Sequence, residues 1–132
     1  MRMLDLARRG WWMLGAVAII LLILTGSLLP LPEVDGLNSN DKLHHAAAYA
    51  ALMFWTVGML RPAWYVVAWA GVVTLGGSVE LVQALMGLGR HADWADFFAN
   101  LLGASLVLML AWAGLGGWAC RVERALGLTG KS

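Results

Sequence analysis

The sequence predicts an all-α fold, an integral membrane bundle of four transmembrane helices formed as one domain by residues 1–132. Three observations support this class. Hydrophobic residues make up 61% of the 132 residues and charged residues only 13%, whereas a soluble domain is about half apolar and about a quarter charged. The mean hydropathy is +0.73. Four long runs carry almost no charge, and each approaches the roughly 20 apolar residues that a helix needs to cross a bilayer.

The four runs are separated by residues that end or interrupt helices. Pro30 and Pro32 end the first run, because proline removes a backbone hydrogen-bond donor and restricts the residue before it. Arg61-Pro62 separates the second run from the third, and residues 87–90 separate the third from the fourth. The predicted spans are residues 11–29, 43–60, 63–86 and 97–120.

The first run has a second interpretation, as a cleavable signal peptide. Arg8 and Arg9 precede it and small residues occur near its end, as in a secretory signal. Its apolar stretch is longer than that of a usual signal, and Trp11 and Trp12 lie where an interfacial aromatic belt is expected. We therefore expect the first span to be retained.

The few charges predict the orientation. With four spans both termini lie on one side, and that side carries seven Lys and Arg residues against two on the other. Cytoplasmic loops are enriched in Lys and Arg, so we expect a multi-pass protein of the inner membrane with both termini cytoplasmic. A net charge of +1 without a basic face argues against nucleic-acid binding. A single cysteine, Cys120, excludes an internal disulfide.

Polar side chains gather at the opposite, extracytoplasmic side. The second and fourth spans start there and the third ends there, so three helices bring polar groups to one depth. Within each group the spacing of three or four residues places the members on one helix face. Ionisable groups in spans normally face the bundle interior or a wet cavity, so the groups predict a shared polar pocket. They are Asp41, His45 and Tyr49; Glu80 and Gln83; and Asp93, Asp96, Asn100 and Gly103.

Most of these residues also have structural interpretations. Glu80 is the hardest to explain in that way, because a carboxylate inside a span needs a partner; His45 and Arg90 are the predicted partners. The small residues at 76–78 and 103–105 are predicted to bring the third and fourth spans together. The structural alternatives are an N-cap for Asp41, headgroup contacts for Lys42 and His44, core packing for Tyr49 and interhelical hydrogen bonding for Asn100.

The ordered polar motif resembles the VanZ-like family of small bacterial membrane proteins. The motif is Asp41-Lys42-x-x-His45-x-x-x-Tyr49, then Glu80-x-x-Gln83, then Arg90-x-x-Asp93-x-x-Asp96-x-x-x-Asn100-x-x-Gly103. It covers residues 41–103, and Ala46 departs from the family pattern, in which an aromatic residue often follows the histidine. The resemblance implies a bacterial membrane protein linked to glycopeptide resistance of the teicoplanin type. It implies no defined reaction.

Three functions are compatible with such a pocket. The first is an enzyme that acts on a lipid or a lipid-linked cell-envelope molecule, because a histidine beside carboxylates suits proton transfer near neutral pH. The second is a non-catalytic binder of an amphiphilic glycopeptide or a cell-wall precursor. The third, a proton-coupled transporter, ranks last, because the ionisable groups lie at one face and four spans would have to form a homo-oligomer to make a pathway.

The enzyme hypothesis gives each polar residue a role. Membrane lipids are the expected surroundings, and Lys42 and Arg90 are expected to bind a phosphate or carboxylate of the substrate. His45 and the carboxylates are possible metal-ligand types, but the sequence contains no compact ligand motif, so neither a metal nor a cofactor is predicted. The predicted catalytic residues are His45, Glu80, Asp41 and Asp96, and the predicted substrate-binding residues are Lys42, Tyr49, Gln83, Arg90, Asp93 and Asn100.

Overall fold

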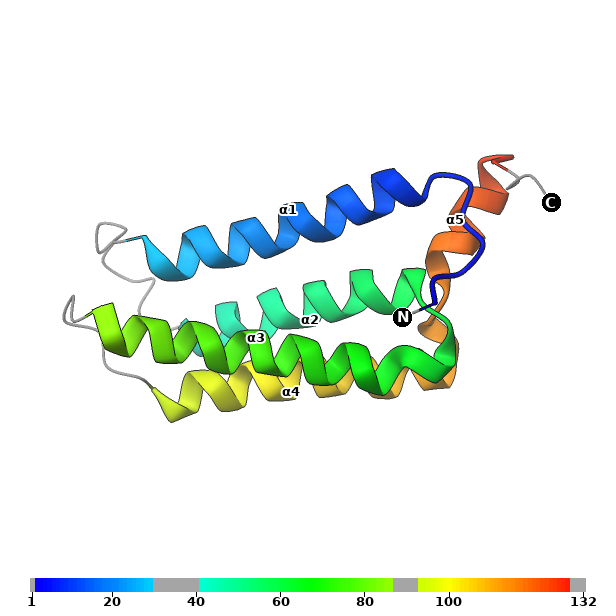
Figure 1. Ribbon diagram of the computed structural model, residues 1–132. Helices are drawn as coiled ribbons and strands as arrows, with labels where there is room; N and C mark the ends of the chain where they lie inside the picture. Colours follow the sequence, from blue (N-terminus) through cyan, green and yellow to red (C-terminus); the bar gives the residue numbers. More distant parts are fainter. Residues whose placement is uncertain (1, 30–40, 87–92, 129–132) are drawn as a thin grey trace.

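The computed structural model describes residues 2–29, 41–86 and 93–128, and within these ranges it contains helices and no sheet. Four long helices lie alongside one another and alternate in direction, while a fifth, short helix crosses one end of the bundle next to the N-terminal segment (Figure 1). The all-α class is therefore confirmed. The helices are α1 (Arg9–Leu28), α2 (Asp41–Met59), α3 (Tyr65–Met86), α4 (Trp94–Leu110) and α5 (Trp118–Ala125).

Three helical segments of the described chain are long and apolar enough to cross a membrane. They are Arg9–Leu28, Pro62–Met86 and Trp94–Leu115, which correspond to the predicted first, third and fourth spans. The predicted second span, α2, is not among them, because its first turns carry Asp41, Lys42 and two histidines. Of these four residues His45 is the one directed into the protein, with 13% of its side chain exposed, whereas Asp41, Lys42 and His44 are exposed.

Helix α1 lies at the edge of the bundle and exposes most of its apolar surface. Ile23 is its one buried residue. Large side chains such as Trp11, Leu14 and Leu22 are more than half exposed. A helix that is apolar on its outer face requires an apolar environment, which a lipid bilayer supplies.

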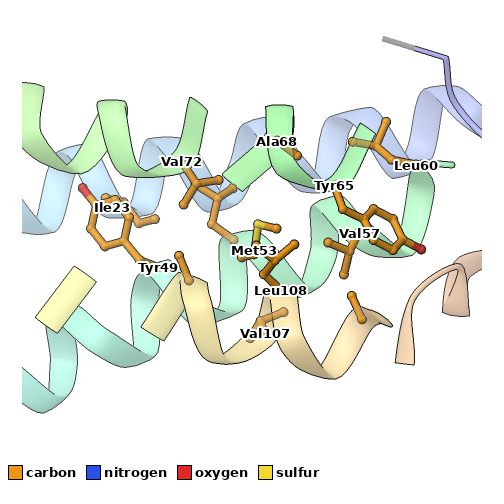
Figure 2. Close-up of a cluster of buried hydrophobic side chains, with 13 residues drawn as sticks. Ile23, Tyr49, Met53, Val57, Leu60, Tyr65, Ala68, Val72, Val107 and Leu108 are labelled. Carbon is orange, nitrogen blue, oxygen red and sulfur yellow. The ribbon is translucent and has the colours of Figure 1, made fainter. Parts of the chain in front are cut away.

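The core runs along the shared interface of α2, α3 and α4 (Figure 2). Met53 and Val57 of α2 are fully buried, and they pack with Val72 of α3 and Val107 of α4. Tyr49 lies two helical turns from the start of α2 and belongs to the same core. The apolar core thus begins directly beside the polar residues at the start of α2.

Glycine allows α2 and α4 to approach closely near that polar end. A Cβ at Gly103 would collide with the backbone carbonyl oxygen of Ala46. In α3, a Cβ at Gly76 would contact Tyr49 and Asn100. The prediction that small residues join α3 to α4 is thus correct for Gly76, whereas Gly103 serves the contact between α4 and α2.

The range predicted as the fourth span does not continue as one helix to Cys120. A π-helical turn, Ala111–Leu115, follows α4. Gly114 within this turn and Gly117 after it adopt positive φ values of 111° and 67°. Glycine takes this conformation at little cost because it has no Cβ. The chain turns there, and the Arg121 guanidinium donates hydrogen bonds to the backbone carbonyl oxygens of residues 114–116. After the turn, α5 crosses the end of the bundle (Figure 1).

Candidate functional site

Three helices bring polar side chains together at the end of the bundle opposite α5. Asp41 and His45 lie on successive turns at the start of α2, and Asp96 and Asn100 do so at the start of α4. Glu80 lies six residues before the end of α3, or about 9 Å along a helix. We call the following set the polar cluster: Asp41, Lys42, His45, Glu80, Asp93, Asp96 and Asn100.

His45 lies at the centre of this cluster, with 13% of its side chain exposed. Its Nδ1 is 3.2 Å from Oδ1 of Asn100 and 3.8 Å from Oε1 of Glu80. Its Nε2 is 3.9 Å from Oδ1 of Asp41. The imidazole therefore has a hydrogen-bond acceptor on the Nδ1 side and carboxylates on both sides. Its position beside Glu80 is the one expected of a partner for that carboxylate.

Lys42 forms the exposed rim of the cluster. Its ammonium lies 3.5 Å from Asp93 Oδ2 and 3.8 Å from Asp96 Oδ1. Asp93 is also the N-cap of α4, and its Oδ1 accepts a hydrogen bond from the Ala95 backbone N–H. That bond, with the nearby Lys42 ammonium, holds the pKa of Asp93 below its usual range against a smaller opposing effect of desolvation.

Several polar atoms below this rim are buried and lack a hydrogen-bond partner among the described residues. Asn100 is only 1% exposed, and Glu80 is 6% exposed. Burying an unsatisfied polar atom costs free energy, so a native protein keeps such a group for a reason. The atoms are the Tyr49 hydroxyl, Glu80 Oε1, Asp96 Oδ1 and Asn100 Nδ2.

Two described residues near the cluster, Gln83 and His44, take no part in these contacts. The Gln83 amide donates a hydrogen bond to the Ser27 carbonyl oxygen of α1 at 2.8 Å, which joins α3 to the edge helix. His44 is exposed and takes no part in the contacts described above. Arg90, the second predicted partner of Glu80, lies outside the described residues.

A buried carboxylate at the other end of the bundle was not predicted. Glu123 of α5 is 4% exposed and accepts hydrogen bonds from the Ala7 and Arg8 backbone N–H groups and from the Trp12 indole. It fixes the N-terminal segment against α5. No spacing in the sequence links Glu123 to these partners, which lie more than 110 positions away.

A cavity of about 270 Å³ also lies at this second end. None of the predicted site residues that the structure describes lines it. The lining residues are Arg8, Trp11, Trp12, Trp55, Glu123, Leu126 and Leu128.

The fold and the polar cluster together define an all-helical protein with membrane-length helices and a partly buried histidine–carboxylate site at one end. Comparison with protein-family models, curated proteins and solved structures finds no match for the chain.

Proposed function

We propose that this chain is a four-span inner-membrane protein whose polar cluster acts on a lipid or a lipid-linked cell-envelope molecule. The observation that carries the proposal is the position of His45. Its imidazole lies between Asp41 and Glu80 and against Asn100, at the end of the bundle. A histidine held between carboxylates is suited to general acid–base catalysis near neutral pH.

The membrane orientation puts this cluster at the extracytoplasmic face. The described helices alternate in direction, and the N-terminal segment lies beside α5 at the end opposite the cluster (Figure 1). In the sequence, seven basic residues belong to the side of the termini and two to the other side, which favours cytoplasmic termini. Helix α2 then crosses with α1, α3 and α4 and begins at the outer surface.

The rim of the cluster matches the headgroup of such a substrate. Lys42 is exposed and near the membrane surface, where its ammonium can bind a phosphate oxygen. Asp41, Glu80 and Asp96 orient His45 or share its proton, and Asn100 holds the ring in place. The VanZ-like resemblance supports an envelope substrate and extends the proposal to reduced susceptibility to teicoplanin-type glycopeptides.

The proposal is tested with the full chain reconstituted in vesicles of bacterial polar lipids. A polyprenyl-pyrophosphate-linked disaccharide peptide is added, and the lipid fraction is followed by mass spectrometry. We expect a new product with the unaltered chain, and loss of that product in His45→Ala and Asp96→Asn chains that keep their thermal stability. His44→Ala is the matched control, because it removes an exposed histidine next to His45.

Two outcomes would contradict the enzyme proposal. Unchanged product formation by the His45→Ala chain would remove His45 from the chemistry. Recovery of the added molecule intact, but bound to the protein in a manner that depends on His45, would replace the enzyme by a non-catalytic binder. The minimum inhibitory concentration of teicoplanin, measured in cells that produce each chain, tests the resistance link separately.

A further inference from the structure

Three residues of the polar cluster offer donor atoms to one point in space. Asp41 and His45 come from α2 and Asp96 from α4, and their donor atoms all lie within 4.8 Å of one another. Donors bound to a single ion at about 2.1 Å each lie about 3–4 Å apart. The Asp41 side chain is 58% exposed, so it has room to move toward the other two donors.

The buried oxygen of Asp96 supplies an independent indication of a ligand. Asp96 is 9% exposed, and its Oδ1 has no hydrogen-bond partner among the described residues. The Lys42 ammonium lies 3.8 Å from this atom, beyond hydrogen-bond distance. A buried, unpartnered carboxylate oxygen costs free energy, and a bound cation would remove that cost.

The orientation of His45 matches that of a metal ligand. Metal-ligating histidines almost always donate their second ring N–H to a carboxylate or a carbonyl oxygen. His45 Nδ1 faces Oδ1 of Asn100 at 3.2 Å and Oε1 of Glu80 at 3.8 Å. Its Nε2 is left on the side of Asp41, where it can bind an ion.

The local charge also favours a cation. The polar cluster holds four carboxylates, and Lys42 is its one permanent positive charge. Lys42 is 61% exposed, and its one ammonium lies 3.5 Å from Asp93 and 3.8 Å from Asp96, so the carboxylates of the cluster outnumber its lysine.

We propose that Asp41, His45 and Asp96 bind one divalent transition-metal cation, through Nε2 of His45 and one oxygen of each carboxylate. One nitrogen and two oxygen donors suit Zn²⁺ or Mn²⁺ better than Mg²⁺, which prefers oxygen ligands and water. The remaining coordination positions are open to water or to a phosphate oxygen, which the ion would polarise as a Lewis acid. This inference deepens the proposed function, because it places a cofactor in the same cluster.

The test is metal binding by the full chain in detergent, with no lipid substrate added. Metal is removed with a chelator, and Zn²⁺, Mn²⁺ and Mg²⁺ are then titrated separately by calorimetry. We expect one tight Zn²⁺ or Mn²⁺ site per chain. We also expect Asp96→Asn and His45→Ala to weaken it about 100-fold or more, and Asn100→Ala, which only orients His45, to weaken it by about 10- to 100-fold. Asp5→Asn, which removes an exposed carboxylate at the opposite end, should leave it unchanged.

A spectroscopic measurement tests the site in a chain that keeps all three proposed ligands. Mn²⁺ bound to a His44→Ala/His91→Ala chain should show electron spin echo modulation from a nitrogen ligand, and ¹⁵N-histidine labelling should change its frequency. Absence of stoichiometric binding, absence of that nitrogen signal, or equal binding by Asp96→Asn would overturn the site. Metal binding without any change to an added lipid would count against the proposed enzyme and leave the metal site standing.

Discussion

His45 and Asn100 meet across the interface of α2 and α4, with Nδ1 of the imidazole 3.2 Å from the side-chain oxygen of the amide. An amide oxygen only accepts hydrogen bonds, so this contact places the hydrogen of a neutral imidazole on Nδ1. The other nitrogen, Nε2, is then available to accept a proton or to bind a metal. The contact therefore determines which nitrogen of a neutral His45 is available for the proposed chemistry.

The first prediction concerns this tautomer. In a chain with His44 and His91 replaced by alanine, ¹⁵N spectra at neutral pH and without metal should show His45 with its hydrogen on Nδ1. In Asn100→Ala the acceptor is gone, and the tautomer should shift toward the Nε2–H form that dominates in water. An Nε2–H tautomer in the otherwise unaltered chain would refute the assigned orientation.

The second prediction concerns the close approach of α4 to α2. Gly103→Ala should lower the free energy of unfolding by about 1–3 kcal/mol, the usual cost of overpacking, because the new methyl group collides with the carbonyl oxygen of Ala46. It should also separate His45 from Asn100.

Gly71→Ala is the matched control for this substitution. Gly71 lies on α3 with no other atom near its Cβ position, so alanine there should be neutral or stabilising by up to about 1 kcal/mol. Thermal unfolding of the two variants in the same detergent makes the comparison. Equal stabilities would show that the α2–α4 contact is looser than described.

The third prediction is a pH dependence at the opposite end. Burial raises the pKa of Glu123, but hydrogen bonds from the Trp12 indole and the Ala7 and Arg8 backbone lower it by more, so the pKa lies below its ordinary value. The carboxylate therefore stabilises the fold at pH values above the unfolded pKa, about 4.3. That stabilisation is lost as the pH falls through the lower, folded pKa.

Glu123→Gln tests this pH dependence. It should cost about 1–3 kcal/mol at neutral pH, because it weakens a set of buried hydrogen bonds, and it should flatten the acid limb of the stability curve. Asp5→Asn, an exposed carboxylate in the same region, should do neither. Thermal midpoints between neutral pH and about pH 3.5 provide the measurement, and an unchanged acid limb in Glu123→Gln would contradict it.

The fourth prediction concerns membrane orientation. In a Cys120→Ser chain, His44→Cys introduces a thiol at an exposed position. This thiol should react with a membrane-impermeant maleimide in spheroplasts. A cysteine at Arg124, exposed on α5, should react only after the membrane is opened. The reverse pattern would place the polar cluster in the cytoplasm and would exclude an extracytoplasmic substrate.

Much of the candidate site could be predicted because helical spacing fixes which residues share a face. Asp41 and His45 are four residues apart, as are Asp96 and Asn100, and each pair lies on one side of its helix in the structure. The pairing of His45 with Glu80 followed from the cost of a lone carboxylate inside a span. The convergence of Asp41, His45 and Asp96 on one point did not follow, because its donors come from two helices whose rotation and separation depend on packing.

The end of the predicted fourth span likewise depends on tertiary structure. Residues 97–120 carry no charge, so hydropathy alone extends the helix to Cys120. The chain turns earlier because Gly114 and Gly117 adopt left-handed conformations, and Glu123 then holds α5 against the N-terminal segment. Hydropathy measures only the cost of transfer to lipid and contains no information on such backbone conformations.

The sequence by itself determined the all-α class, the apolar lengths of α1, α3 and α4, and the gathering of polar residues at one end, because these follow from composition and from the 3.6-residue helical period. Only the tertiary structure decided that Gly103 brings α4 against α2, that Asn100 orients His45, and that Asp96 joins Asp41 beside the ring. Those relationships depend on side-chain volumes at helix interfaces. Because Gly103 has no methyl group, the backbones of α4 and α2 approach closely, and this separation sets the distance between the polar groups that the two helices carry.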